Sequence, residues 1–216
     1  MLSRRQISLA IVTVFALAGC RREGDLVLNE GVGITAVRSA CPAVGVPDYT
    51  GDITTFRDPS SRLASNVDIT AALTDVESTC AEDGARIYTA ASFNVVARRT
   101  DVRGARTVQL PYYSTVLRGG SSVVSKRVGT VTISFADGQE RAMGSGQAAA
   151  YVDRASATLP ADVRERITRK RKPGDPDAAI DPLSDPEVRQ ALNRATFELL
   201  VGFQLSESQL AYNATR

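Results

Sequence analysis

Two serines of this chain lie where a hydroxyl could act as a nucleophile. Ser125 precedes Lys126, the pair that a serine–lysine dyad needs, and Ser145 lies between two glycines, as in the turn that presents the serine of many hydrolases. Both patterns are incomplete. Neighbouring residues of a strand point to opposite faces, and position 143 is methionine where that turn requires glycine. The chain also has no histidine, the commonest general base. We therefore expect no catalytic residue and no cofactor, while a pair of carboxylates in a shared cleft stays an open alternative.

A cluster of basic residues follows Pro160. It could contact lipid headgroups, phosphates or an acidic partner, or it could be a solvated helix face that nearby aspartates neutralise. The cluster, a candidate contact surface, consists of Arg164, Arg166, Arg169, Lys170, Arg171 and Lys172. The aspartates beyond it are spaced like calcium ligands but match no calcium-binding loop, and prolines adjoin them. We expect an exposed acidic linker and no metal site at these aspartates, which are Asp175, Asp177, Asp181 and Asp185.

The first twenty residues have the pattern of an export signal. A basic start at Arg4 and Arg5 precedes a run without charge, and small residues close that run before Cys20. The run is shorter than the roughly 20 residues that a membrane-spanning helix needs. Leu17-Ala18-Gly19-Cys20 resembles the lipobox of bacterial lipoproteins. The resemblance implies that residues 1–19 are a signal peptide, that Cys20 carries acyl chains, and that residues 20–30 tether the folded domain to a membrane. By analogy with sorting in that family, Arg21 favours the periplasmic face of the outer membrane over the inner membrane.

Lipidation of Cys20 leaves Cys41 and Cys80 as a pair in the mature chain. An even pair in an exported protein is most simply a disulfide, and no Cys-x-x-Cys spacing points to redox chemistry. Removing residues 1–19 takes away two arginines and no acid, so the formal charge falls from +2 to 0. A neutral domain argues against nucleic acid as a partner.

The middle of the chain predicts strands joined by turns. Five β-prone runs cover residues 67–71, 85–99, 106–118, 123–135 and 141–152. Gly119-Gly120 and Asp137-Gly138 are hairpin signals between successive runs. Before these runs, residues 31–60 contain short apolar pieces separated by turn residues. Strands linked in sequence order predict an antiparallel meander that folds into a sandwich or small barrel.

The C-terminal third predicts helices and one more strand. A helix over residues 163–172 stops at Pro173-Gly174, and a second begins at Asp185, which can cap it. Residues 196–205 could extend that helix, but their apolar side chains alternate, so we favour a final strand. Ser206 and Gln209 then form a capping box for a short terminal helix. The expected fold is mainly β. It is an antiparallel, immunoglobulin-like β-sandwich over residues 31–216, with a helical insertion at about 160–195.

These features predict a lipid-anchored envelope protein that serves as a non-enzymatic interaction or assembly module at the periplasmic face of the outer membrane. Its partners would be the membrane, through Cys20, and another envelope protein. The alternative is a periplasmic domain that binds a lipid or glycan in a pocket lined by Phe93, Tyr112 and Tyr113. A packed core around those rings would count against that alternative.

Overall fold

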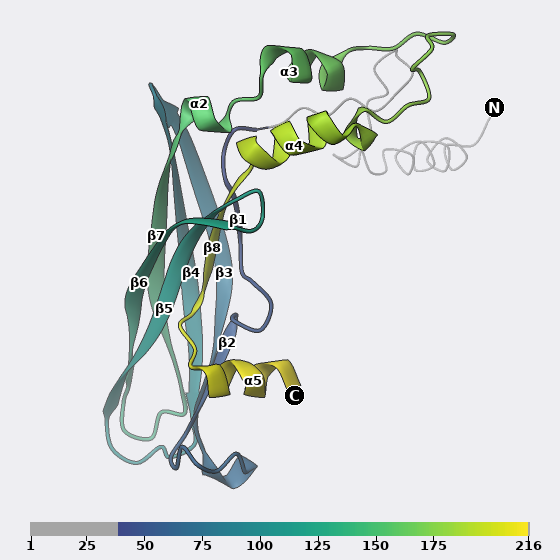
Figure 1. Ribbon diagram of the computed structural model, residues 1–216. Coiled ribbons are helices and arrows are strands. Elements are labelled where there is room, and N and C mark those ends of the chain that lie inside the picture. The colour runs from purple at the N-terminus through teal and green to yellow at the C-terminus, as the bar shows by residue number, and fades with distance from the viewer. Residues whose placement is uncertain (1–38, 216) are drawn as a thin grey trace, which may run out of the picture.

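A computed structural model describes residues 39–215, so the predicted signal peptide, Cys20 and the tether lie outside the described residues. The fold is mainly β, with short helices towards the C-terminus, as the sequence predicts (Figure 1). The strands are β1 Ala43–Gly45, β2 Asp52–Phe56, β3 Val67–Asp83, β4 Arg86–Arg99, β5 Arg106–Arg118, β6 Ser122–Phe135, β7 Arg141–Asp153 and β8 Phe197–Phe203. The helices are η2 Ala64–Asn66, α2 Arg154–Ala157, α3 Ala161–Thr168, η3 Pro182–Ser184, α4 Pro186–Ala195 and α5 Glu207–Thr215.

The strands form two four-stranded sheets. Sheet I has the order β1-β8-β5-β6 and sheet II the order β2-β3-β4-β7. Neighbours are antiparallel, except that β1 runs parallel to β8. The five predicted strands are confirmed nearly to the residue, apart from the first, which continues to residue 83. The predicted meander is wrong, because the chain passes from sheet II to sheet I after β4 and back again after β6.

The two predicted turns have different roles. Gly119 and Gly120 have positive φ and join the paired strands β5 and β6, which confirms the first hairpin. Gly138 also has positive φ, but the turn at Asp137-Gly138 joins β6 to β7, which belong to different sheets. A tight turn reverses the chain in both places. Whether the strands it joins then pair depends on the rest of the core.

One hydrophobic core lies between the sheets. Side chains alternate along the strands, so that Phe93 and Val95 of β4 share this core with Ile133 of β6 and Leu199 of β8.

The segment around Ser145 is closely packed. A Cβ atom on the neighbouring Gly146 would lie 2.3 Å from the Phe93 ring, so this segment is a tightly packed strand, as expected, and not a catalytic turn.

The β4–β5 and β6–β7 crossings between the sheets meet at the buried side chain of Arg99, which is 1% exposed. Its guanidinium donates four hydrogen bonds of 2.7–2.8 Å to main-chain carbonyl oxygens. The acceptors are Val102 and Gly104 in the β4–β5 connection and Ala136 and Gln139 in the β6–β7 connection. The guanidinium also lies over the Phe135 ring, 5.2 Å from its centroid. One side chain therefore holds both connections together.

An ion pair at the same end links the two sheets. Arg106 of β5 donates to both carboxylate oxygens of Asp68 on β3, at 2.7 Å each. The hydrogen bonds from Arg106 hold the pKa of Asp68 below its usual range. The charged pair therefore favours the folded state above the normal pKa of an aspartate, near 4, and this contribution is lost as the pH falls.

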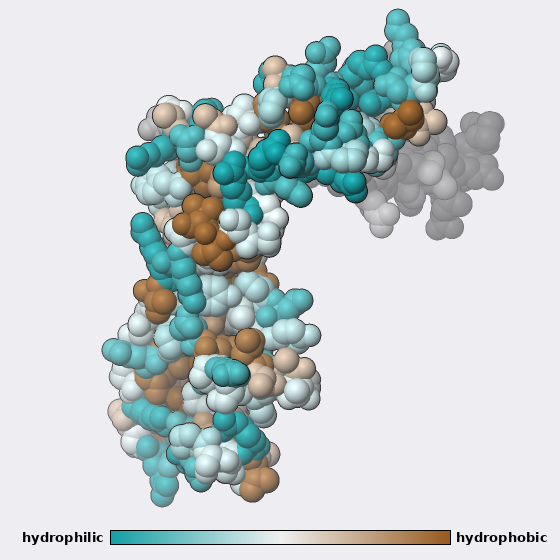
Figure 2. Space-filling model, viewed as in Figure 1, coloured by the Kyte–Doolittle hydropathy of each residue, from teal (hydrophilic) through white to brown (hydrophobic). Residues whose placement is uncertain are grey.

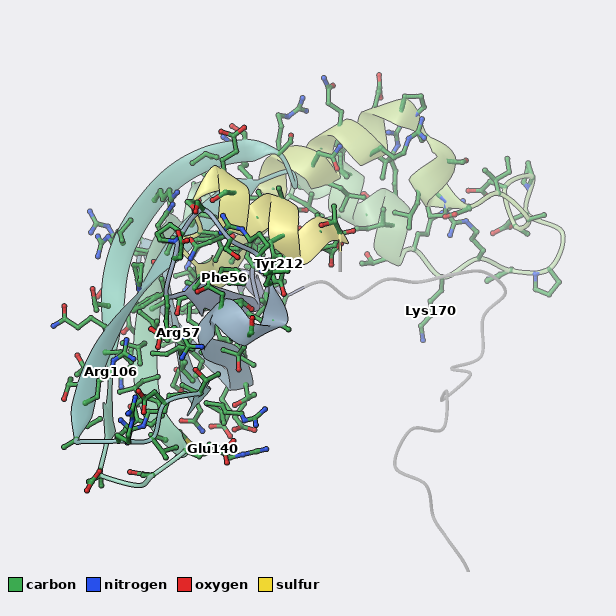
Figure 3. The ribbon with its side chains drawn as sticks, turned by 90° about the horizontal axis from the view of Figure 1, so that it is seen from below. Phe56, Arg57, Arg106, Glu140, Lys170 and Tyr212 are labelled. Atoms are coloured by element: carbon green, nitrogen blue, oxygen red, sulfur yellow. A yellow bond between two sulfur atoms is a disulfide. The ribbon has the colours of Figure 1, made fainter. Side chains whose placement is uncertain are left out.

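The helix α5 packs against β2 of sheet II. Tyr212 of α5 packs edge-on against Phe56 of β2, with ring centroids 5.3 Å apart (Figure 3). Asn213 donates to the carbonyl oxygens of Tyr49 and Asp52, at 2.8 Å each. The capping box is confirmed, because the Ser206 amide donates to the Gln209 side chain and the Gln209 amide donates to the Ser206 hydroxyl.

The segment from α2 to α4 forms a helical arm that projects sideways from one end of the sheets (Figure 1). It has a small core of its own, made by Val163, Ile167, Val188 and Ala191. The helix α3 is shorter than predicted, since it ends at Thr168 and Arg169 is extended. The helix α4 begins at Pro186 with Asp185 as its cap, as predicted, and β8 confirms the final strand. Within residues 39–215, no helix is long and apolar enough to cross a membrane.

We expect the change Arg99→Met to lower the free energy of unfolding by about 3–5 kcal/mol, because it removes the four hydrogen bonds of a buried guanidinium to main-chain carbonyl oxygens. Urea denaturation of the variant and the wild type measures the difference. Arg98→Met is the matched control, since Arg98 is exposed and pairs with Glu140 at the surface. The control should change stability by less than about 1 kcal/mol. Equal effects of the two changes would contradict the role given to Arg99.

The double change Cys41→Ser and Cys80→Ser should lower the free energy of unfolding by about 4 kcal/mol, because it opens a long loop in the unfolded chain. The two cysteines are 39 residues apart and are joined by a disulfide. The wild type in reductant should fall to the stability of the variant, which itself should not respond to reductant. A variant as stable as the oxidised wild type would contradict this expectation.

Candidate functional site

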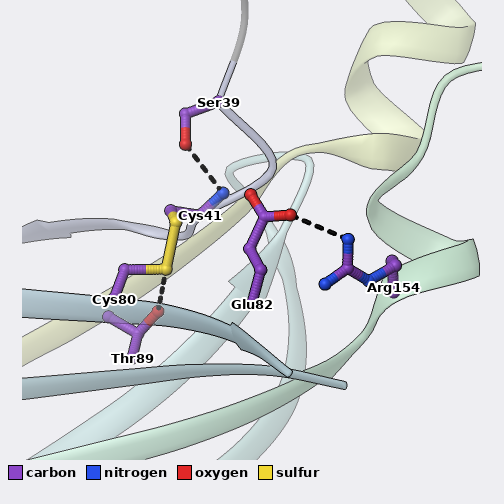
Figure 4. Close-up of a disulfide and its surroundings, with 6 residues drawn as sticks. All are labelled: Ser39, Cys41, Cys80, Glu82, Thr89 and Arg154. Atoms are coloured by element: carbon purple, nitrogen blue, oxygen red, sulfur yellow. Dashed lines mark hydrogen bonds and ion pairs between the residues drawn. A yellow bond between two sulfur atoms is a disulfide. The ribbon is translucent and has the colours of Figure 1, made fainter. Parts of the chain in front are cut away.

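The predicted disulfide is confirmed between Cys41, just before β1, and Cys80 on β3, with an S–S distance of 2.09 Å (Figure 4). Thr89 of β4 donates its hydroxyl hydrogen to the Cys80 sulfur at 3.6 Å. Beside it, Arg154 at the start of the arm pairs with Glu82 at 2.8 Å. This end of sheet II is therefore tied to β1 by a covalent bond and to the arm by an ion pair.

Half of the basic cluster takes part in holding the arm together. Arg169 donates to Asp177, and Arg166 lies 3.4 Å from a carboxylate oxygen of Asp185. Arg171 is 5% exposed. Its Nε lies 3.4 Å from Asp177, and its Nη2 donates to the carbonyl oxygen of Arg166. These contacts favour the interpretation in which the aspartates neutralise the cluster.

The other half of the cluster is free. Arg164, Lys170 and Lys172 are exposed, and no carboxylate of residues 39–215 pairs with them. Lys170 points away from the arm into solvent (Figure 3). The candidate contact surface is thus reduced to three separate cations. Its role as a contact surface stays a prediction.

The acidic loop caps the main chain instead of gathering around an ion. Asp175 accepts from the Lys172 amide, Asp181 from the Leu183 amide and Asp185 from the Glu187 amide, at 2.8–3.0 Å. In the described part of the chain, no group of three or more potential metal ligands comes together.

The three aromatic rings that were predicted to line a pocket do not line a common pocket. Phe93 is buried and packs edge-on against Tyr112, with centroids 5.0 Å apart. The Tyr112 hydroxyl donates to the carbonyl oxygen of Gln147 at 2.6 Å. Tyr113 follows Tyr112 on the same strand and lies on the opposite face, under the Lys126 ammonium. This packing counts against a ligand site built from these rings.

The Ser125–Lys126 pair forms no dyad. The Lys126 nitrogen lies 5.0 Å from the centroid of the Tyr113 ring, while Ser125 accepts a hydrogen bond through its carbonyl oxygen from the Thr115 hydroxyl. Among the described residues, no hydrogen bond joins the side chains of Ser125 and Lys126.

The first half of β6 is an open strand edge. Residues 122–128 are all exposed, and β6 is the last strand of sheet I. Val123, Val124 and Val128 are among the most exposed apolar side chains, with Val124 56% exposed. Figure 2 shows apolar surface gathered below the arm, where the β5–β6 hairpin lies in Figure 1. We call residues 122–128 the β6 edge.

The outer face of sheet II contains two adjoining hollows of about 410 and 180 Å³. Glu77, Ser92 and Gln147 line both of them. A break in the β3–β4 register between Thr74 and Glu77 borders the smaller hollow, and within it Asp75 has a φ of 51°. An aspartate tolerates this left-handed conformation better than most residues, and such residues cluster at functional sites. We call the two hollows together the sheet II groove.

The sequence did not predict the sheet II groove. Its lining residues come from three strands, and only the pairing register brings them together. No family model matches this chain, and neither a curated protein nor a solved structure matches it. The evidence for the sheet II groove and the β6 edge is therefore their geometry.

We expect Asp177→Asn to loosen the arm while the sheets stay intact, because Arg169 and the buried Arg171 both lose their carboxylate. Hydrogen exchange of the amides in α3 and α4 should become faster, with β4 and β8 unchanged. The hydrogen bond from Arg169 lowers the pKa of Asp177. In the wild type, the same loosening should therefore appear only as the pH falls below about 4, where the aspartate of the unfolded chain takes up its proton.

The matched control is Asp162→Asn, because Asp162 lies on the same arm without an ion pair in the described residues. It should leave the exchange rates of α3 and α4 unchanged. Equal loosening by both changes, or none by Asp177→Asn, would contradict the role given to Asp177.

Proposed function

We propose that this protein is a lipid-anchored, non-enzymatic interaction module at the periplasmic face of the outer membrane. The resemblance of Leu17-Ala18-Gly19-Cys20 to a lipobox supports the anchor and the location. The Cys41–Cys80 bond supports export, because structural disulfides persist in oxidising compartments outside the cytosol.

We propose further that the two sheets are an immunoglobulin-like sandwich. Immunoglobulin domains pair their second strand with the fifth in one sheet and the third with the sixth in the other. The pairs β4–β7 and β5–β8 have this relation if β3 to β8 are counted as the first to the sixth strand. The fourth of these, β6, pairs with β5 in sheet I, as the additional strand of variable-type domains does. The chain departs from that pattern at β1, which comes from the start of the domain and runs parallel to β8.

A non-enzymatic role is supported by what the candidate nucleophiles contact. Ser145 lies in a tightly packed strand, and Ser125 is separated from Lys126 by the alternation of β6. The chain offers no histidine to activate either hydroxyl.

The observation that carries the interaction role is the β6 edge. An exposed strand edge presents unpaired main-chain donors and acceptors, to which an extended segment of another protein can add as a further strand. Lys126 and Arg127 discourage pairing with a like-charged strand. They favour a partner strand with carboxylates opposite them and aliphatic side chains beside Val124 and Val128.

A photo-reactive amino acid at position 124 of the full-length, lipidated chain should crosslink an envelope protein in intact cells. Mass spectrometry of the joined peptides should identify an extended, acidic segment as the partner. The double change Lys126→Glu and Arg127→Glu should remove the product, since like charges across a strand pair repel.

The same photo-reactive residue at position 143 is the matched control, because Met143 is equally exposed but lies on sheet II. It should not give this product, and Cys20→Ala should lose it together with the anchor. A product that forms equally from both positions, or that survives the charge reversal, would contradict the proposal.

A further inference from the structure

The sheet II groove is built from cross-strand pairs that change character along β4 and β7. Tyr88 lies opposite Tyr151, and the next outward pair is Ala90 with Ala149. Polar pairs follow, first Ser92 with Gln147 and then Asn94 with Ser145. Because the alanines are small, the middle of the face is hollow between taller tyrosine side chains at one end and polar side chains at the other.

The tyrosine end offers an aromatic platform. The two rings lie 4.9 Å apart at an interplanar angle of 43°, and Tyr151 is 63% exposed. Tyr88 is half-buried, and the exposed ring of Tyr151 stays largely in water. Such a ring pair can stack against the apolar C–H face of a ligand while its hydroxyl groups stay solvated.

The polar end offers hydrogen-bonding groups that the fold leaves unused. The side chains of Ser92 and Gln147 make no hydrogen bond within residues 39–215, and Glu77 has no ion pair there. Asn94 donates to the Asp75 carboxylate at 3.1 Å, which orients its amide and leaves its oxygen free to accept. The groove thus combines side-chain donors and acceptors with an apolar platform, the usual composition of a small-molecule site.

The charges of the groove select among ligands. Of the described residues that line the two hollows, none is lysine or arginine, and the charged ones are Asp75 and Glu77. A phosphate or other anion would find no counter-charge there. The floor is shallow and open to solvent, so an acyl chain would stay largely in water.

The length of the groove suits an extended ligand. From Tyr88 to Asn94 the strand advances six residues, or about 20 Å at about 3.4 Å per residue. A chain of several sugar rings has this length and alternates apolar ring faces with hydroxyl groups. An extended peptide would need unpaired main-chain partners, which the central strand β4 lacks because β3 and β7 pair with both of its edges.

We propose that the sheet II groove binds an uncharged oligosaccharide, with Tyr88 and Tyr151 stacking on a sugar ring and Glu77, Ser92 and Gln147 bonding to hydroxyl groups further along. This site goes beyond the interaction role of the β6 edge, which belongs to the other sheet. The lipid anchor would then hold a glycan-binding face close to the membrane.

Isothermal titration of the full-length protein in detergent with chitohexaose, cellohexaose and maltohexaose tests the proposal. At least one of these sugars should bind. Tyr151→Ala should weaken that binding about tenfold through loss of stacking, and Gln147→Ala should weaken it several-fold. Tyr151→Phe should bind nearly as well as the wild type, because the ring remains.

Tyr49→Asn is the matched control, since Tyr49 is 56% exposed in a turn remote from the groove and asparagine tolerates its left-handed backbone. It should leave the affinity unchanged. Thermal unfolding separates lost binding from lost folding, and the exposed Tyr151 should not affect it. Failure of all three sugars to bind, or binding that Tyr151→Ala leaves intact, would overturn the proposal. Neither result would bear on crosslinking at the β6 edge.

Discussion

The buried guanidinium of Arg99 is the constraint on which the two-sheet arrangement depends. Its four carbonyl partners come from the β4–β5 and β6–β7 connections, two of those that carry the chain between the sheets. The hydrogen bonds are donated from a side chain that is itself buried, so each contributes more than a bond at the surface would. Among the described residues the cation has no carboxylate partner, and it is stabilised by carbonyl dipoles and the Phe135 ring. A lysine offers three donors without the planar fork and could not reach all four acceptors.

The opposite end of the sheets is held by different means. The disulfide ties β3 to the segment before β1, and Arg154 ties the arm to Glu82. The side chains of Ser92 and Gln147 in the sheet II groove make no hydrogen bond among the described residues, and the valines of the β6 edge are exposed. The two surfaces belong to different sheets, the β6 edge to sheet I and the groove to sheet II.

The residues of the basic cluster divide into two groups with different surroundings. Arg166, Arg169 and Arg171 hold the loop of aspartates against the arm, whereas Arg164, Lys170 and Lys172 are exposed to solvent. The run alone does not separate these groups. The helix ends at Thr168, and the extended residues beyond it turn Arg171 inward.

Local sequence determined the strands, the caps and the disulfide. The alternation of apolar side chains indicates which segments can bury one face. A capping box joins residues that are three apart in the sequence. With two cysteines in the mature chain, each has the other as its partner. Tertiary structure decided what local signals leave open. The Asp137-Gly138 turn suits a hairpin or a crossing equally well, and only the packing of Phe135, Val131 and the connections around Arg99 selects the crossing. The groove depends on register across three strands, because a shift of one residue would turn Tyr151 and Gln147 inward.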